Sequence, residues 1–266
     1  KISHPTKVIE CEIDLPGSKS ISNRLLIIQA LCKDKFEIKN LSLSEDTTLL
    51  KKALSKTTEI IDIGAAGTSF RFLTSYLSIL EGREFILTGT DRITKRPIKE
   101  LVSALRTLGA QISYVNRESP PLKITGKKLL GGEITINGNV SSQFISSLLL
   151  IAPTLQNGLR LNILDDIVSR PYIDMTLEIM ADFGVNSSWK GNKINIEPQR
   201  YIAKDYIVEA DWSAAAFWFE IAALSDNSRI KLNKLNRQSI QGDSKVVSLF
   251  SNLCVSSTFQ KHSIVI

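Results

Sequence analysis

Residues 96–115, RPIKELVSALRTLGAQISYV, and residues 170–189, RPYIDMTLEIMADFGVNSSW, share one pattern, and this pattern decides the fold. Each stretch begins with Arg-Pro, continues with apolar residues at helical spacing, reaches a glycine and ends in strand-forming residues. Proline in the first turn and glycine after the last turn mark the two ends of a helix. The pattern therefore predicts an amphipathic helix followed by a strand at two places in the chain.

A second repeated element is a turn of small and hydroxyl-bearing residues that leads directly into an apolar helix. Its four copies are LPGSKSISNRLLIIQAL (15–31), GAAGTSFRFLTSYLSIL (64–80), NGNVSSQFISSLLLIAP (137–153) and EADWSAAAFWFEIAAL (209–224). A strand pattern follows each copy, at FEIKNL (36–41), EFILTG (84–89), LRLNIL (159–164) and RIKLNK (229–234). Two further amphipathic helices are expected near Asp46 and Asp243.

The repeated unit thus reads strand, helix, strand, helix, strand, strand. Four such units fill the chain, at residues 11–63, 64–126, 127–198 and 199–266, and the first is compressed. Alternating strands and helices predict an α/β (α+β) layered architecture. An ordinary doubly wound sheet, whose helices are alike by chance, is the alternative.

The composition excludes several classes of protein. Of the 266 residues, 43% are hydrophobic and 23% are charged, which is typical neither of a disulfide-stapled miniprotein nor of a disordered chain. No run of about 18 uncharged apolar residues occurs, so no membrane span is expected. The cysteines Cys11, Cys32 and Cys254 are scattered, which indicates free thiols in a reducing cytoplasm.

The histidines and the net charge limit the kinds of catalytic and binding site that can be expected. The only two histidines, His4 and His262, lie near the chain ends, so neither a Ser-His-Asp device in the middle of the chain nor a zinc site is expected. The net charge of +6 is modest, and the basic residues form no long tracts. This pattern favours a site for a small anionic metabolite over a nucleic-acid surface.

The starts of the apolar helices are candidate anion sites. A helix N-terminus offers unpaired N–H groups and about half a positive charge, and small residues let an anion approach it. Ser18, Lys19 and Ser20 form one such start, and Arg24 follows Ser20 by one helical turn. Similar starts occur at Gly67-Thr68, followed by Arg71, and at Ser141-Ser142-Gln143.

Seven motifs, in order along the whole chain, carry a resemblance to a known family. They are LPGSKSISNR, GAAGTSFRFL, TGTDRITKRPI, GNVSSQFISSLLL, VSRPYIDMTL, VEADWSAAAFWF and QGDSKVV. With them the chain resembles the 5-enolpyruvylshikimate-3-phosphate (EPSP) synthases, in the short form found in Bacteroidetes-like bacteria.

The resemblance implies the enolpyruvyl transferase fold, an inverse α/β barrel of repeated βαβαββ units. It implies a complete first domain of three units at residues 15–203. Residues 1–14 and 204–266 would form part of a second domain, in which the N-terminal strand pairs with the fourth unit. Helix N-termini would point into a cleft between the domains. Because the family has six units, the chain is expected to lack the C-terminal third.

The resemblance also implies an activity. The family transfers the enolpyruvyl group of phosphoenolpyruvate to the 5-hydroxyl of shikimate 3-phosphate and releases phosphate, on the way to the aromatic amino acids. No metal and no organic cofactor are expected, nor a nucleic-acid or membrane partner. The protein would be a cytoplasmic monomer and a target of the herbicide glyphosate.

Matching motif to motif assigns the site residues. The residues implied to bind shikimate 3-phosphate are Lys19, Ser20, Arg24, Ser141, Ser142, Gln143, Ser169 and Tyr172. Those implied to bind phosphoenolpyruvate are Lys19, Gly67, Thr68, Arg96 and Gln143. Lys19, which would touch both substrates, is the one residue of the chain implied to be catalytic.

The chain departs from the family at a few positions. Ala65 replaces a usual Asn, Phe72 replaces a frequent Pro, and Cys254 stands where a helix-ending Gly is usual. Ala65 puts sensitivity to the inhibitor in doubt. The family's general-base Asp, and its later Glu, Lys and Arg groups, would lie beyond Ile266, so little turnover is expected of this chain alone.

Two other functions stay open at this point. A UDP-N-acetylglucosamine enolpyruvyl transferase would have the same fold, but Asp91 stands where that family has a Cys. A non-catalytic module that binds anions or RNA would show a steep salt dependence with any polyanion.

Overall fold

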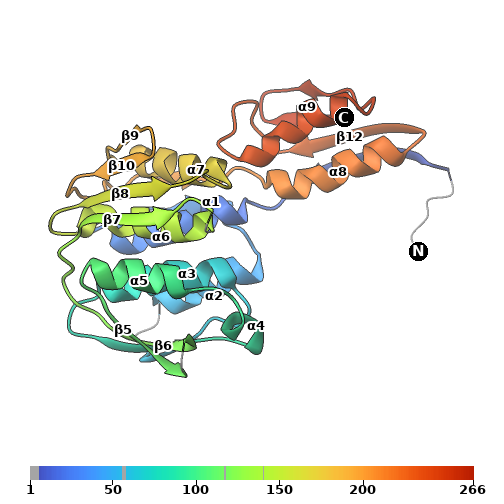
Figure 1. Ribbon diagram of the computed structural model, residues 1–266. Coiled ribbons are helices and arrows are strands. Elements are labelled where there is room, and N and C mark those ends of the chain that lie inside the picture. The colour runs from blue at the N-terminus through green and yellow to red at the C-terminus, as the bar shows by residue number, and fades with distance from the viewer. Residues whose placement is uncertain (1–5, 56–57, 117, 140) are drawn as a thin grey trace. The chain divides into compact units, whose positions relative to one another are not determined.

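The computed structural model describes residues 6–55, 58–116, 118–139 and 141–266, so His4 lies outside the described residues (Figure 1). The chain divides into two units. Unit 1 comprises Lys1–Lys19, Ile38–Leu43 and Ile207–Ile266, and unit 2 comprises Ser20–Glu37 and Ser44–Tyr206. Over the described ranges, none of the helices combines the length and the apolar character needed to traverse a bilayer.

Three four-stranded sheets share one strand order. In unit 2 the order is β3-β4-β6-β5 in one sheet and β7-β8-β10-β9 in the other, and in unit 1 it is β1-β12-β14-β13. The first two strands of each sheet are parallel, and the remaining pairs are antiparallel. The strands of unit 2 are β3 (Ile60–Asp62), β4 (Glu84–Thr88), β5 (Gln111–Asn116), β6 (Ser119–Thr125), β7 (Gly132–Asn137), β8 (Leu159–Leu164), β9 (Ser188–Lys190) and β10 (Lys193–Ile196). Those of the unit 1 sheet are β1 (Val8–Asp14), β12 (Asn227–Asn233), β13 (Thr258–Phe259) and β14 (Ser263–Val265).

The same two helices accompany each sheet, which confirms the repeat. An apolar helix joins the first strand to the second in unit 2, and its copies are α3 (Gly67–Ser78) and α6 (Ser142–Ile151). A second helix leads from the second strand to the hairpin, and its copies are α5 (Lys99–Thr107), α7 (Arg170–Asp182) and, in unit 1, the short α9 (Val246–Ser251). In unit 1 the apolar helix is α8 (Trp212–Leu224).

The N-terminal strand pairs with the fourth repeat, as expected. β1 lies parallel to β12 from Val8 opposite Asn227 to Asp14 opposite Asn233. The whole of unit 2 is therefore inserted between the first strand of this sheet and its apolar helix α8.

The first repeat differs from the prediction. Its helices are α1 (Lys19–Leu31) and α2 (Glu45–Ser55), but its strand is only β2 (Ile38–Lys39), paired with β11 (Tyr206–Ile207). β2 ends early because Asn40 has a left-handed backbone with φ of 56°. The boundary at residue 63 was wrong, since β3 already belongs to the second sheet.

Three local details also differ. The helix expected near Asp243 begins as a 3₁₀ turn, η2 (Gly242–Lys245), before α9. A one-turn helix, α4 (Asp91–Thr94), precedes Arg96 and was not predicted. A second 3₁₀ turn, η1 (Ala152–Thr154), extends α6.

The core of unit 2 lies around α1, α3 and α6. Figure 1 shows these helices between the two four-stranded sheets. Nearly every residue of α3 and α6 is buried, because apolar or small residues lie on all faces of both helices. The start of each helix is thereby held in place by rigid packing.

The same type of turn ends three of the helices. Gly109, Gly184 and Cys254 have positive φ values of 102°, 79° and 62°. The amide after each donates to a carbonyl oxygen in the last helical turn, at 2.9 to 3.1 Å, as in a Schellman motif. In the third copy a cysteine takes the left-handed conformation that glycine adopts without a steric cost.

Candidate functional site

The starts of four helices, α1, α3, α6 and α7, carry most of the predicted site residues. At α6 the Ser141 hydroxyl accepts a 3.4 Å hydrogen bond from the amide of Gln143. The residues before α3 and α7, Ala66 and Ser169, make no such side-chain bond, and Ser169 has a left-handed φ of 59°. First-turn amides of these helices lack a helical acceptor, so they are donors for an anion.

Arg24 joins the starts of three helices. It is 2% exposed, and its Nε donates to Thr176 Oγ1 at 2.8 Å. Its Nη1 donates to the carbonyl of Ser20 at 2.8 Å, and its Nη2 donates to Ser146 Oγ at 3.1 Å and to the carbonyl of Tyr172 at 3.0 Å. Four of the five guanidinium N–H groups are used within unit 2. Burial lowers the pKa of Arg24 to about 10, so the group stays charged at neutral pH.

Arg71 has the same arrangement on α3. It is 6% exposed, and its Nη1 donates to the carbonyl of Gly67 at 2.9 Å. Its Nη2 donates to the carbonyl of Pro97 at 3.1 Å, while its buried Nε has no partner among the described residues. Burial, and then the nearby charge of Arg96, lower the pKa of Arg71 to about 10.

Two buried aromatic rings support these arginines. The guanidinium carbon of Arg24 lies 5.6 Å from the centre of the Phe72 ring, and that of Arg71 lies 5.3 Å from the centre of the Phe144 ring. A cation over a ring face is attracted by its quadrupole, more strongly where water is excluded. Phe72, one of the departures from the family pattern, therefore has a structural role under Arg24.

Arg96 lies over the backbone of Gly67. A Cβ atom added at Gly67 would overlap Nη1 of Arg96, so only glycine leaves room for this guanidinium group. Arg96 is half-buried, and its side chain has no hydrogen bond or ion pair within the described ranges. A cationic fork thus stands beside the first turn of α3 with its donors unused.

The other predicted residues lie at the helix starts. Lys19 begins α1 with an exposed side chain, and its amide lies 3.4 Å from Asp211 Oδ2. The side chains of Ser20, Thr68, Ser142, Gln143 and Ser169 likewise make no hydrogen bond in the part of the chain that the structure describes. Arg24 contacts both Ser20 and Tyr172, and Arg96 contacts Gly67.

Several supporting residues were missed by the sequence reasoning. Ser146 and Thr176 bind Arg24 and bond to each other at 2.9 Å. Ser147 bonds to Ser75 and donates to the carbonyl of Arg71 at 2.9 Å. Their only signal is that they lie about one to two helical turns after the helix starts. Across the described ranges, no three His, Cys, Asp or Glu side chains gather as metal ligands.

Known proteins resemble this chain over nearly its whole length. The EPSP synthase (3-phosphoshikimate 1-carboxyvinyltransferase) family profile matches residues 3–58 and 48–256. The 3-phosphoshikimate 1-carboxyvinyltransferase of Bacteroides fragilis (strain YCH46) is 51% identical over 265 residues, which are 99% of this chain and 64% of that relative. The corresponding protein of Aliivibrio salmonicida is 41% identical over 270 residues, 90% of this chain and 63% of that relative.

A solved structure has the same fold. An EPSP synthase from Acinetobacter baumannii aligns with a TM-score of 0.80 at 21% identity, over 97% of this chain and 64% of that chain. This likeness confirms the predicted α/β fold of repeated units. The chain spans about 64% of the length of the Bacteroides relative.

Proposed function

Because the chain belongs to the EPSP synthase family, we propose that it provides much of the substrate-binding surface of a 3-phosphoshikimate 1-carboxyvinyltransferase. In the proposed reaction the 5-hydroxyl oxygen of shikimate 3-phosphate bonds to C2 of phosphoenolpyruvate. The hydroxyl loses its proton and the methylene carbon gains one. The tetrahedral intermediate then loses a proton from the new methyl group together with inorganic phosphate.

The first proposed subsite holds shikimate 3-phosphate between the starts of α1, α6 and α7. Donors for the phosphate come from the side chains and first-turn amides of Ser141 and Ser142, and Lys19 adds a full charge. Arg24 has one N–H left, so it contributes mainly a nearby positive charge. The remaining residues assigned to this subsite are Ser20, Gln143, Ser169 and Tyr172.

The second proposed subsite holds phosphoenolpyruvate at the start of α3. Gly67 lets the ligand approach the backbone, Thr68 adds a hydroxyl, and the unused fork of Arg96 can bind a carboxylate or phosphate bidentately. Lys19 and Gln143 would lie between the two ligands. Lys19 is the proposed catalytic residue of this chain, because its ammonium group can stabilise negative charge that develops between the substrates.

One observation carries the proposal: within the described ranges, several polar and cationic side chains at or beside these helix starts make no hydrogen bond or ion pair, namely those of Lys19, Thr68, Arg96, Ser142 and Gln143. Buried polar groups normally have a hydrogen-bond partner, and Ser142 is only 7% exposed. Two phosphorylated acids would supply acceptors for these donors. The three cysteines are free, which is consistent with the cytoplasmic location that we propose.

Calorimetric titration of the chain with shikimate 3-phosphate tests the proposal. We expect saturable binding that the Ser142→Ala and Lys19→Gln variants weaken, whereas Lys51→Gln, at an exposed position on α2, does not. Absence of binding to the folded chain at low and at physiological salt would overturn it. Equally tight binding of any polyanion, with steep salt dependence, would favour an RNA-binding module instead.

A further inference from the structure

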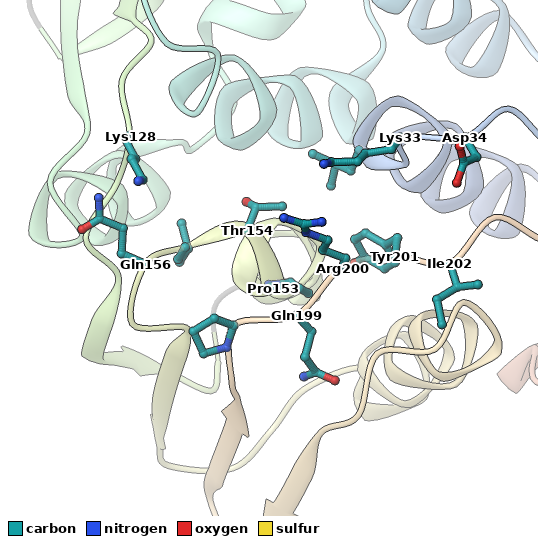
Figure 2. Close-up of a pocket in the computed structure, with 13 residues that line it drawn as sticks. Lys33, Asp34, Lys128, Pro153, Thr154, Gln156, Gln199, Arg200, Tyr201 and Ile202 are labelled. Atoms are coloured by element: carbon teal, nitrogen blue, oxygen red, sulfur yellow. The ribbon is translucent and has the colours of Figure 1, made fainter.

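A cavity of about 830 Å³ lies in unit 2, away from the predicted site residues (Figure 2). It is bordered by the C-terminal end of α1, by η1 and by the chain segment 198–202. The predicted site lies at the other end of α1, which is about 18 Å away for a helix of this length. The volume is in the range of small-molecule sites, about 300–1,000 Å³.

Three exposed cations line this cavity: Lys33, Lys128 and Arg200. Within the described ranges, none of the three makes an ion pair or a side-chain hydrogen bond. Some lysines elsewhere on unit 2 have carboxylate partners, such as Lys99 with Glu118 at 2.9 Å and Lys123 with Glu84 at 3.2 Å, whereas others, such as Lys51, have none in the described residues.

The cations come from separate segments of the chain. In Figure 2 the side chains of Lys33 and Arg200 extend toward each other from two separate chain segments. Asp34 also borders the cavity, but its carboxylate is paired with neither cation. An anion that binds near both charged groups would be attracted by each of them. Lys128 and the amide of Gln156 lie together at the other end of the cavity.

The walls of the cavity are held by bonds to the backbone. The Thr154 hydroxyl donates to the carbonyl of Ile151 at 2.7 Å, and the Tyr201 hydroxyl donates to that of Leu150 at 2.8 Å. The Gln199 amide donates to the carbonyl of Asn186 at 2.9 Å. These polar groups are used, so the cation ends, the Gln156 amide and the Asp34 carboxylate are the polar groups that remain.

Part of the wall is apolar. Leu31, Pro153, Leu155, Pro198 and Ile202 border the cavity together with the ring of Tyr201. A ligand that fills the cavity would therefore place a hydrocarbon or ring body against these side chains and an anionic group between Lys33 and Arg200.

We propose that this cavity is a second ligand site of the protein, for a small phosphate monoester with an apolar or ring-shaped body. A phosphate monoester carries close to two negative charges at neutral pH, which matches the facing Lys33 and Arg200. Its oxygens accept from the guanidinium fork and the ammonium group at once. The proposal does not depend on the function proposed for the helix starts.

Phenyl phosphate is a suitable probe, followed by amide chemical shifts in a ¹⁵N NMR titration at about 20 mM ionic strength, where screening is weak. We expect saturable shifts at Lys33, Gln156 and Arg200. Inorganic phosphate should bind here more weakly, because it lacks the apolar body. Any binding at the helix starts would shift the amides of Ser20, Gly67 and Ser142 as a separate set.

The double variant Lys33→Gln/Arg200→Gln should raise the dissociation constant for phenyl phosphate at the cavity about tenfold or more, since each charge-assisted bond contributes at least that factor. Lys51→Gln on α2 is the matched control and should change nothing. The proposal is overturned if the cavity amides do not shift, or if the double variant binds phenyl phosphate there as tightly as the unchanged chain.

Discussion

Arg24 and Arg71 occupy equivalent positions in two successive repeats, and each donates to the carbonyl oxygen four residues earlier. Arg24 bonds to Ser20 at 2.8 Å and Arg71 to Gly67 at 2.9 Å. Each also lies over a phenylalanine ring that the next apolar helix contributes. The repeat thus places two buried guanidinium groups directly behind the helix starts that form the candidate site.

Replacing Arg24 by lysine should destabilise the chain by about 2–4 kcal/mol. Lysine cannot reproduce the fork that serves Thr176, Ser146 and two carbonyl groups, and it would leave buried acceptors unpaired. Urea denaturation followed by circular dichroism measures the change. The matched control is Arg96→Lys, whose side chain has no partner in the described residues, and it should change the free energy of unfolding by less than about 0.5 kcal/mol. Equal losses in both variants would contradict the structural role of Arg24.

Gly67→Ala should weaken phosphoenolpyruvate binding about tenfold and leave shikimate 3-phosphate binding almost unchanged. The added methyl group would overlap Nη1 of Arg96 and push the guanidinium group away from the start of α3. Loss of one charge-assisted contact accounts for a factor of that size. Calorimetry with each ligand measures both affinities in the same variant. If both affinities fell together, the variant would have damaged the fold rather than the subsite.

Cys254→Gly should stabilise unit 1 by about 1 kcal/mol. Cys254 has a φ of 62°, which is strained for a residue with a Cβ atom. The complementary variant is Gly109→Ala, at the equivalent helix end, where a Cβ would meet no atom within 4 Å. Because the added Cβ meets no atom, the cost comes only from the positive φ of this position, and the variant should destabilise unit 2 by about 1 kcal/mol. Thermal unfolding of both variants checks the pair, and shifts of the same sign would contradict this reasoning.

Acid should weaken the pairing of β1 with β12. Hydrogen bonds from Lys231 and Asn233 lower the pKa of Glu12 below 4.5, and bonds from Asn233 and Lys234 lower that of Asp14 below 3.8. A carboxyl group whose pKa is lower in the folded state stabilises the fold above its ordinary pKa. That contribution disappears as pH falls and the group takes up a proton.

The measurement is hydrogen exchange of the β12 amides at about pH 6 and about pH 3, with intrinsic rates corrected. Protection should fall with acid, and it should fall less in the double variant Lys231→Gln/Lys234→Gln. Both carboxyl groups are exposed, so the effect should be small and should shrink in high salt. Identical pH dependence in the variant would show that these ion pairs do not contribute.

Local signals in the sequence determined the repeat. Apolar spacing, Pro171 near the start of α7 and the glycines after α5 and α7 act within one or two turns, so they are readable residue by residue. The same short-range rules placed the candidate site residues at helix starts, and they put Arg24 and Arg71 one turn behind those starts.

Only the tertiary structure decided which distant segments meet. No local signal pairs β1 with β12, a pairing that only the family resemblance implied, and none places Phe72 under Arg24. The second cavity combines Lys33, Lys128 and Arg200 from three separate parts of the chain. Strand pairing and side-chain packing depend on which complementary surfaces the whole chain brings together, and no local pattern contains that information.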